Sequence, residues 1–118
     1  MIGKWQSLVI DCEDPNKLAT FYQELLGMVR IQEHDDWISI GEAAGRPGVD
    51  FQRVERLVRP QWPDADHPQQ MHVDVLVGDL DAAEADVLRL GATSLNAGEK
   101  TFRVYTDPSG HPFCLVLT

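Results

Sequence analysis

The stretch SLVIDCEDPNKLATFYQELLG, residues 7–27, carries the pattern that decides the fold. It begins with an apolar, strand-like run, residues 7–12, and continues through Asp14-Pro15 into a helical apolar stripe that stops at Gly27. Asp14 can accept hydrogen bonds from the free N–H groups at a helix start, Pro15 fits the first helical position, and Gly27 tolerates the left-handed backbone that ends a helix. The stretch therefore predicts a strand followed by a helix that packs one face against a core.

The same pattern returns 65 residues later as HVDVLVGDLDAAEADVLRLG, residues 72–91. Here Asp81 followed by Glu84 resembles a capping box, and Gly91 follows the apolar stripe. Asp107-Pro108-Ser109-Gly110 predicts a type I turn near the C-terminus. Three short strand candidates follow each helix: 28–34, 37–41 and 49–54 in the first half, and 92–96, 100–106 and 112–117 in the second. Each half therefore reads βαβββ.

This internal repeat predicts one α+β domain that occupies all 118 residues, a length that suits a single domain. The repeats span residues 1–58 and 71–118, and the Pro- and Asp-rich segment 59–70 joins them. We expect the two halves to superpose and to form a curved eight-stranded sheet around a cleft, with both helices packed outside it.

The charge balance excludes several classes of partner. Ten Lys and Arg residues against nineteen Asp and Glu residues give a formal net charge of −9, which repels phosphate backbones and anionic lipids. No nucleic-acid or membrane partner is therefore expected. The N-terminal residues lack the apolar core of a signal peptide, and the two cysteines, Cys12 and Cys114, fit reduced thiols, so we expect a cytoplasmic protein.

A family resemblance rests on these motifs together. With its two βαβββ units, its Asp14-Pro15 helix that ends in Leu25-Leu26-Gly27, and its closing DPSGHPF at residues 107–113, the chain resembles the vicinal oxygen chelate superfamily. More narrowly, the chain looks like the small glyoxalase and bleomycin-resistance-like proteins of that superfamily. The resemblance implies the glyoxalase/bleomycin resistance/dihydroxybiphenyl dioxygenase fold and a homodimer. Because that superfamily includes isomerases, dioxygenases, transferases, epimerases and antibiotic-sequestering proteins, function has to be argued from the site.

The resemblance places four metal-ligand positions at Ser7, Gln52, His72 and Cys114. The repeat relates Ser7 to His72 at an offset of 65 and Gln52 to Cys114 at an offset of 62. The family pattern at these positions is mostly His, Gln and Glu, whereas a Ser hydroxyl is a poor ligand and a thiolate selects soft metals. We therefore expect the four side chains to lie close together, with no stoichiometric divalent metal and no other cofactor.

Strand alternation puts His72 and Asp74 on one face. The resemblance implies that this face lines the cleft, which makes them the candidate proton-transferring groups. The alternative for His72 is a histidine hydrogen-bonded inside the core. The expected ligand-binding residues are Ser7, Asp11, Trp37, Gln52, Trp62, Arg103 and Cys114. Each has a structural alternative: solvation for the carboxylate, core or interface packing for the tryptophans, a surface ion pair for the arginine, and a small buried thiol for the cysteine.

Three functions are compatible with this set of residues. The first is a protein that binds or sequesters a small molecule without a metal, and the net charge of −9 favours cationic ligands. The second is a metal-dependent lyase or isomerase of the glyoxalase type. The third is a metal-free enzyme in which His72 acts as general acid or base.

Overall fold

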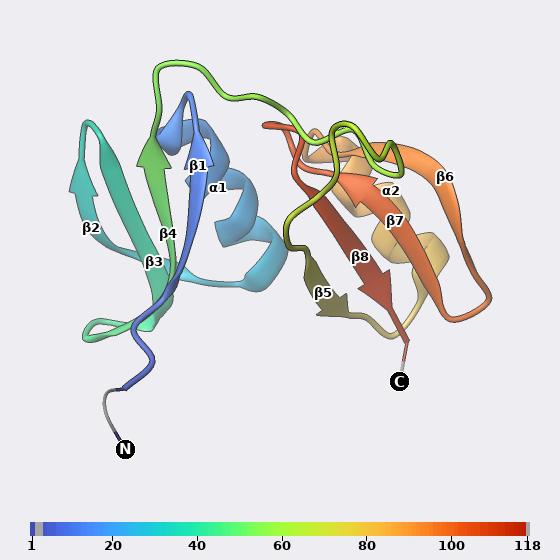
Figure 1. The fold of residues 1–118 in the computed structure, drawn as a ribbon. Coiled ribbons are helices and arrows are strands. Elements are labelled where there is room, and N and C mark those ends of the chain that lie inside the picture. The colour runs from blue at the N-terminus through green and yellow to red at the C-terminus, as the bar shows by residue number, and fades with distance from the viewer. Residues whose placement is uncertain (2–3, 118) are drawn as a thin grey trace. The chain divides into compact units, whose positions relative to one another are not determined.

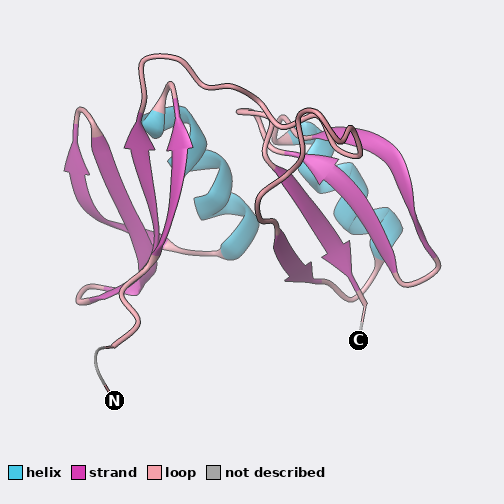
Figure 2. Cartoon of the chain, in the orientation of Figure 1, coloured by secondary structure: helices cyan, strands magenta, loops and turns pink. Residues whose placement is uncertain are grey.

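The structure, a computed structural model, describes residue 1 and residues 4–117, which form two compact units, Met1–Leu57 and Val58–Thr118. Each unit contains one α-helix and four strands in the order βαβββ (Figures 1 and 2). The predicted α+β class and the two repeated halves are confirmed. The eight strands are divided between two four-stranded sheets, one in each unit, where the sequence predicted one eight-stranded sheet.

The first unit builds a mixed sheet with the strand order β1-β4-β3-β2. Its elements are β1 (Leu8–Cys12), α1 (Pro15–Leu26), β2 (Val29–His34), β3 (Trp37–Ala43) and β4 (Arg46–Arg53). β1 and β4 pair in parallel, and the other pairs are antiparallel. Helix α1 contacts β3 and β4, and the side chains that face it form the core. The largest fully buried side chains of the unit come from both the helix and the sheet: Leu18 and Tyr22 on α1, Ile40 on β3 and Phe51 on β4.

Both ends of α1 follow the sequence prediction. The Lys17 N–H donates to the Asp14 carboxylate at 3.1 Å, which satisfies one of the free donors of the first turn. Pro15 occupies the start of the helix. Gly27 has φ +67°, the left-handed conformation that ends the helix, and its N–H donates to the carbonyl of Gln23.

The second unit has the equivalent strand order, β5-β8-β7-β6. Its elements are β5 (Val73–Leu76), α2 (Leu80–Arg89), β6 (Thr93–Glu99), β7 (Phe102–Thr106) and β8 (Pro112–Val116). β5 and β8 pair in parallel, and α2 contacts β8. The rings of Tyr105 and Phe113 stack in the core with their centroids 5.5 Å apart.

The start of α2 differs from the prediction. The helix is capped by Asp79, whose carboxylate accepts from the N–H groups of Asp81 and Ala82 at 2.9 and 3.1 Å. The predicted capping box of Asp81 and Glu84 is therefore wrong, because Asp81 already lies inside the first helical turn. Both of these carboxylates instead accept from the Arg103 guanidinium on β7.

The turn between β7 and β8 forms as predicted. The Gly110 N–H donates to the carbonyl of Asp107 at 2.9 Å, which closes the four-residue turn. The buried Asp107 carboxylate also accepts from the N–H groups of Ser109 and His111. This turn fixes the start of β8, the strand that carries Cys114. No helix among the described residues is long and apolar enough to cross a membrane.

Candidate functional site

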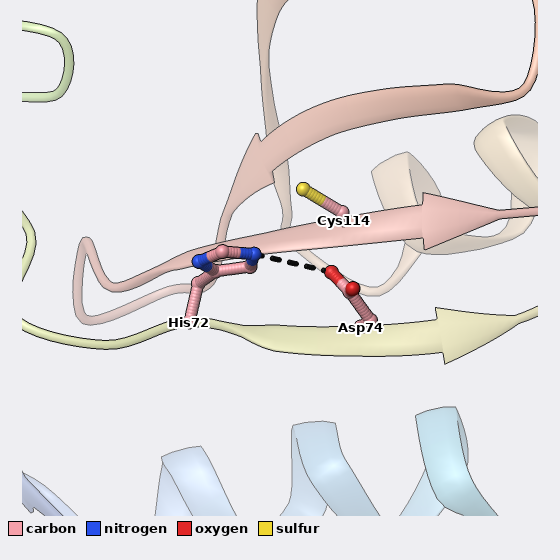
Figure 3. A group of neighbouring side chains, drawn as sticks. All are labelled: His72, Asp74 and Cys114. Atoms are coloured by element: carbon pink, nitrogen blue, oxygen red, sulfur yellow. Dashed lines mark ion pairs between the residues drawn. The ribbon is translucent and has the colours of Figure 1, made fainter.

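Three potential proton-transferring or metal-ligating groups meet on the second sheet: His72, Asp74 and Cys114 (Figure 3). His72 Nε2 lies 3.2 Å from Asp74 Oδ1, and one ligand atom from each of the three residues lies within 4.8 Å of the others. The side chains of His72 and Asp74 are 40% and 58% exposed, whereas Cys114 is buried. The sequence predicted all three as site residues, and the structure brings them together.

Strand geometry explains this cluster. Asp74 on β5 is the direct partner of Cys114 on the neighbouring β8, so both side chains lie on the same face of the sheet. His72 immediately precedes β5 and lies two residues from Asp74, which returns its side chain to that face. Val75 and Leu115 point to the opposite face and are buried. The cluster therefore lies on the face of the sheet away from the unit's core.

The environment of Cys114 favours the neutral thiol. Burial raises the pKa of Cys114 above its ordinary value, and the negative charge of Asp74 and a hydrogen bond to Asp74 raise it further. The thiol is therefore a poor nucleophile and a poor ligand for a hard metal ion at neutral pH. His72 and Asp74 are the exposed groups of the cluster, and both can form hydrogen bonds with a bound molecule.

The first unit carries a polar pair at the equivalent place. The Ser7 hydroxyl donates to Asp50 Oδ2 at 2.6 Å, and Asp50 is only 5% exposed. Ser7 was predicted as a site residue, whereas sequence reasoning missed Asp50.

The sheet registers show why Asp50 was missed. Val9, two residues after Ser7, pairs with Asp50, just as Asp74 pairs with Cys114. The structural counterpart of Cys114 is therefore Asp50, at an offset of 64, and the predicted match of Cys114 with Gln52 is wrong. The sequence alignment paired Gly48 with Gly110 and was therefore two residues out of register. The cause is that the connection between β3 and β4 differs in length from the one between β7 and β8. The signal that could have found Asp50 is the buried pair Val49 and Phe51, which matches Phe113 and Leu115.

Three further predicted residues share this face of the first sheet. Gln52 on β4 pairs with Asp11 on β1 and with Trp37 on β3, so the three side chains form a row across the strands. Asp11 and Gln52 are exposed, whereas Trp37 is half-buried and its indole N–H donates to the Ser39 hydroxyl at 3.3 Å. The structure thus groups these residues with the Ser7–Asp50 pair.

Arg103 lies apart from the cluster of the second sheet. Arg103 pairs across strands with the buried Leu115 and binds Asp81, at 2.7 Å, and Glu84 on α2. This places its side chain on the helix-facing side, opposite Cys114, and the hydrogen bond to Asp81 raises the pKa of Arg103 above its ordinary value. Trp62 is half-buried in the segment that precedes β5.

The four predicted metal-ligand positions are split between the units. Ser7 and Gln52 belong to the first unit, and His72 and Cys114 belong to the second. The proximity of all four side chains stays a prediction.

Comparison with known proteins agrees with this architecture. The family model described as a glyoxalase-like domain matches residues 7–116. A glyoxalase/bleomycin resistance protein/dioxygenase family enzyme from Burkholderia phytofirmans PsJN superposes with a TM-score of 0.72 at 18% identity, with 95% of this chain and 96% of that chain covered. No match was found among curated protein sequences.

Two other similar structures have more specific descriptions. The fosfomycin resistance protein FosX from Listeria monocytogenes has a TM-score of 0.72 at 16% identity, with 100% of this chain and 93% of that chain covered. The trypanothione-dependent glyoxalase I of Leishmania major has a TM-score of 0.69 at 17% identity, with coverages of 98% and 86%. At these identities the likeness establishes the fold, and the match of the family model over nearly the whole sequence establishes the relationship: this chain belongs to the glyoxalase-like domain family of the vicinal oxygen chelate superfamily.

Proposed function

We propose that this protein binds a small organic molecule over the His72–Asp74–Cys114 cluster and that it does so without a resident metal. The observation that carries the proposal is the exposed imidazole of His72, which lies 3.2 Å from the Asp74 carboxylate. An imidazole oriented by a carboxylate presents its other ring nitrogen for a hydrogen bond with a ligand. The same orientation allows it to take up or release a proton, so a metal-free acid–base reaction on the bound molecule is compatible with this site.

The chemistry of the cluster argues against a resident hard metal ion. Divalent ions that activate oxygen substrates prefer carboxylate, carbonyl and imidazole ligands, and His72 and Asp74 are the only donors of this kind in the cluster. The third donor, Cys114, must lose a proton before it can bind a metal, and its raised pKa opposes that loss. Two ready donors fall short of the three that a catalytic metal site usually has.

The similar structures have different activities, so the function of this chain has to be inferred from the side chains at its site. They include a fosfomycin resistance protein and a glyoxalase I, which are different activities on one fold. The fosfomycin resistance protein and the glyoxalase/bleomycin resistance protein/dioxygenase family enzyme supply the first compounds to test, namely fosfomycin and bleomycin. A library of small polar aromatic compounds extends the set beyond the relatives.

Amide NMR spectra of the labelled protein test the proposal directly. Ligands should shift the amide signals of Asp74 and Cys114, and His72→Ala should raise Kd about tenfold, the effect of losing roughly 1.4 kcal/mol of hydrogen bonding. His34→Ala is the matched control, because it removes an exposed histidine at the end of β2 and should leave Kd unchanged. The proposal is wrong if no compound shifts the amide signals of β5 and β8, or if His72→Ala binds a compound as tightly as the wild type does.

A metal-dependent enzyme of the glyoxalase type is the second candidate, and the 4.8 Å spacing of the three ligand atoms favours it. His72, Asp74 and Cys114 together would suit zinc better than magnesium or manganese, because zinc accepts nitrogen, oxygen and sulfur. Zinc bound there would polarise a ligand oxygen. This candidate predicts that added zinc raises the melting temperature of the wild type and leaves that of Cys114→Ala unchanged, whereas the metal-free proposal predicts equal responses.

A further inference from the structure

The first unit contains a pocket of its own, on the face of the sheet that carries the Ser7–Asp50 pair. Its volume is about 470 Å³, within the range of small-molecule sites. The residues that line it are Gln6, Ile31, Gln32, Trp37, Ser39 and Asp50. All six belong to Met1–Leu57, so the described lining of the pocket lies within this unit.

Only one of the two carboxylate oxygens of Asp50 accepts a hydrogen bond among the described residues. Its Oδ2 accepts from the Ser7 hydroxyl at 2.6 Å, whereas its Oδ1 is buried and has no hydrogen-bond partner in the part of the chain that the structure describes. None of the ion pairs among the described residues includes Asp50. A buried carboxylate oxygen without a donor is costly, and such a cost persists where the group serves a ligand.

Trp37 and Ser39 complete the recognition surface beside this charge. Ser39, which is 5% exposed, is the direct strand partner of Asp50, and the Trp37 indole N–H donates to its hydroxyl. This hydrogen bond fixes the orientation of the indole. An aromatic ring near a carboxylate is the arrangement that attracts an organic cation, through the ring's negative face and the opposite charge together.

We infer that this pocket binds the ammonium group of a primary or secondary organic amine, with Asp50 Oδ1 as its acceptor and the Trp37 indole beside it. A single free oxygen suits one N–H donor better than the two-pronged guanidinium fork, because Oδ2 is already engaged by Ser7. Gln6 and Gln32 are exposed, flexible side chains that can shift to admit the nitrogen and offer amide oxygens to its remaining hydrogens. The net charge of −9 favours a cation at long range.

This inference rests on the proposed function only in treating the protein as a small-molecule binder, since the residues involved differ from the His72–Asp74–Cys114 cluster. The test titrates the full chain with 2-phenylethylamine and follows the Trp37 indole N–H signal, assigned from Trp37→Phe. The neutral 2-phenylethanol and the anionic 3-phenylpropanoate are the matched compounds. The amine should bind, and the alcohol and the carboxylate should bind at least tenfold more weakly.

Two variants separate a specific carboxylate from overall charge. Asp50→Asn should raise the Kd of the amine at least tenfold while Ser7 keeps an oxygen to donate to, so the amide spectrum should remain that of a folded chain. Asp35→Asn removes the same charge from the exposed turn between β2 and β3 and should leave Kd unchanged. The inference is overturned if the amine fails to bind at millimolar concentration, if the alcohol binds equally well, or if Asp50→Asn binds as the wild type does.

The two proposals can fail separately. Amine binding that survives His72→Ala and is lost in Asp50→Asn supports the pocket whatever the fate of the His72 site. If compounds shift the amide signals of β5 and β8 but no amine shifts the Trp37 indole signal, the proposed function is supported and this inference is wrong.

Discussion

Cys114 couples the ionisation of the candidate site to the stability of the fold. Burial and the charge of Asp74 raise its pKa in the folded chain, whereas the unfolded chain keeps a thiol pKa of about 8.5. As pH rises, the unfolded chain therefore loses this proton first. The stabilisation from the protonated thiol is complete below about pH 8.5 and is lost as pH rises through the folded-state pKa.

Two measurements check this prediction. The free energy of unfolding in urea should fall more steeply between pH 8 and pH 10 in the wild type than in Cys114→Ala. Tyr105, whose pKa burial also raises, contributes with the same sign in both proteins, so the difference isolates the thiol. In a Cys12→Ala background, Asp74→Asn should lower the thiolate titration midpoint seen by ultraviolet absorbance, and an unchanged midpoint would refute the coupling.

At the scale of single residues, the sequence predicted the second-unit cluster better than the first. His72 and Asp74 are two residues apart, so strand alternation assigns both to one face, and the family resemblance placed Cys114, the strand partner of Asp74, beside them. Asp50 required the strand register, which depends on where the preceding connection ends. Arg103 could not be placed, because its partners Asp81 and Glu84 come from a helix whose docking position is set by packing.

At the scale of elements, the helix caps show which features a local sequence pattern can predict. Asp14, Pro15 and Gly27 predicted both ends of α1. Each acts locally, because a capping carboxylate, a first-turn proline and a left-handed glycine need no partner from elsewhere in the chain. The predicted cap of α2 was wrong by two residues, because carboxylates at both Asp79 and Asp81 could cap the helix. The division of the strands into two sheets is a long-range property that strand patterns do not carry.

The corrected cap makes a specific prediction for α2. Asp79→Ala should destabilise the protein by about 1 kcal/mol, because the N–H groups of Asp81 and Ala82 lose their acceptor. Asp86→Ala removes an exposed carboxylate that pairs with Arg89 at the surface, and it should cost less than about 0.5 kcal/mol. Urea unfolding measures both, and equal effects would contradict Asp79 as the cap.

At the scale of the whole molecule, we propose that the protein is a homodimer. β1, β2 and β5 are outer strands of their sheets, and each carries an exposed apolar side chain: Val9, Val29 and Leu76, which are 38%, 50% and 64% exposed. Outer strands with apolar surface favour pairing with another chain. Light scattering on a sizing column should give twice the 13.2 kDa chain mass at micromolar concentration, and a monomer mass would contradict the dimer.

The central claim is a glyoxalase-like protein whose His72–Asp74–Cys114 cluster works without a resident metal. Elemental analysis of protein purified without chelators or an affinity metal tests it most directly. The claim predicts only traces of zinc, nickel and manganese in the wild type and in Cys114→Ala alike. About one equivalent of any of these metals per chain in the wild type, lost in Cys114→Ala, would contradict it and favour the metal-dependent enzyme.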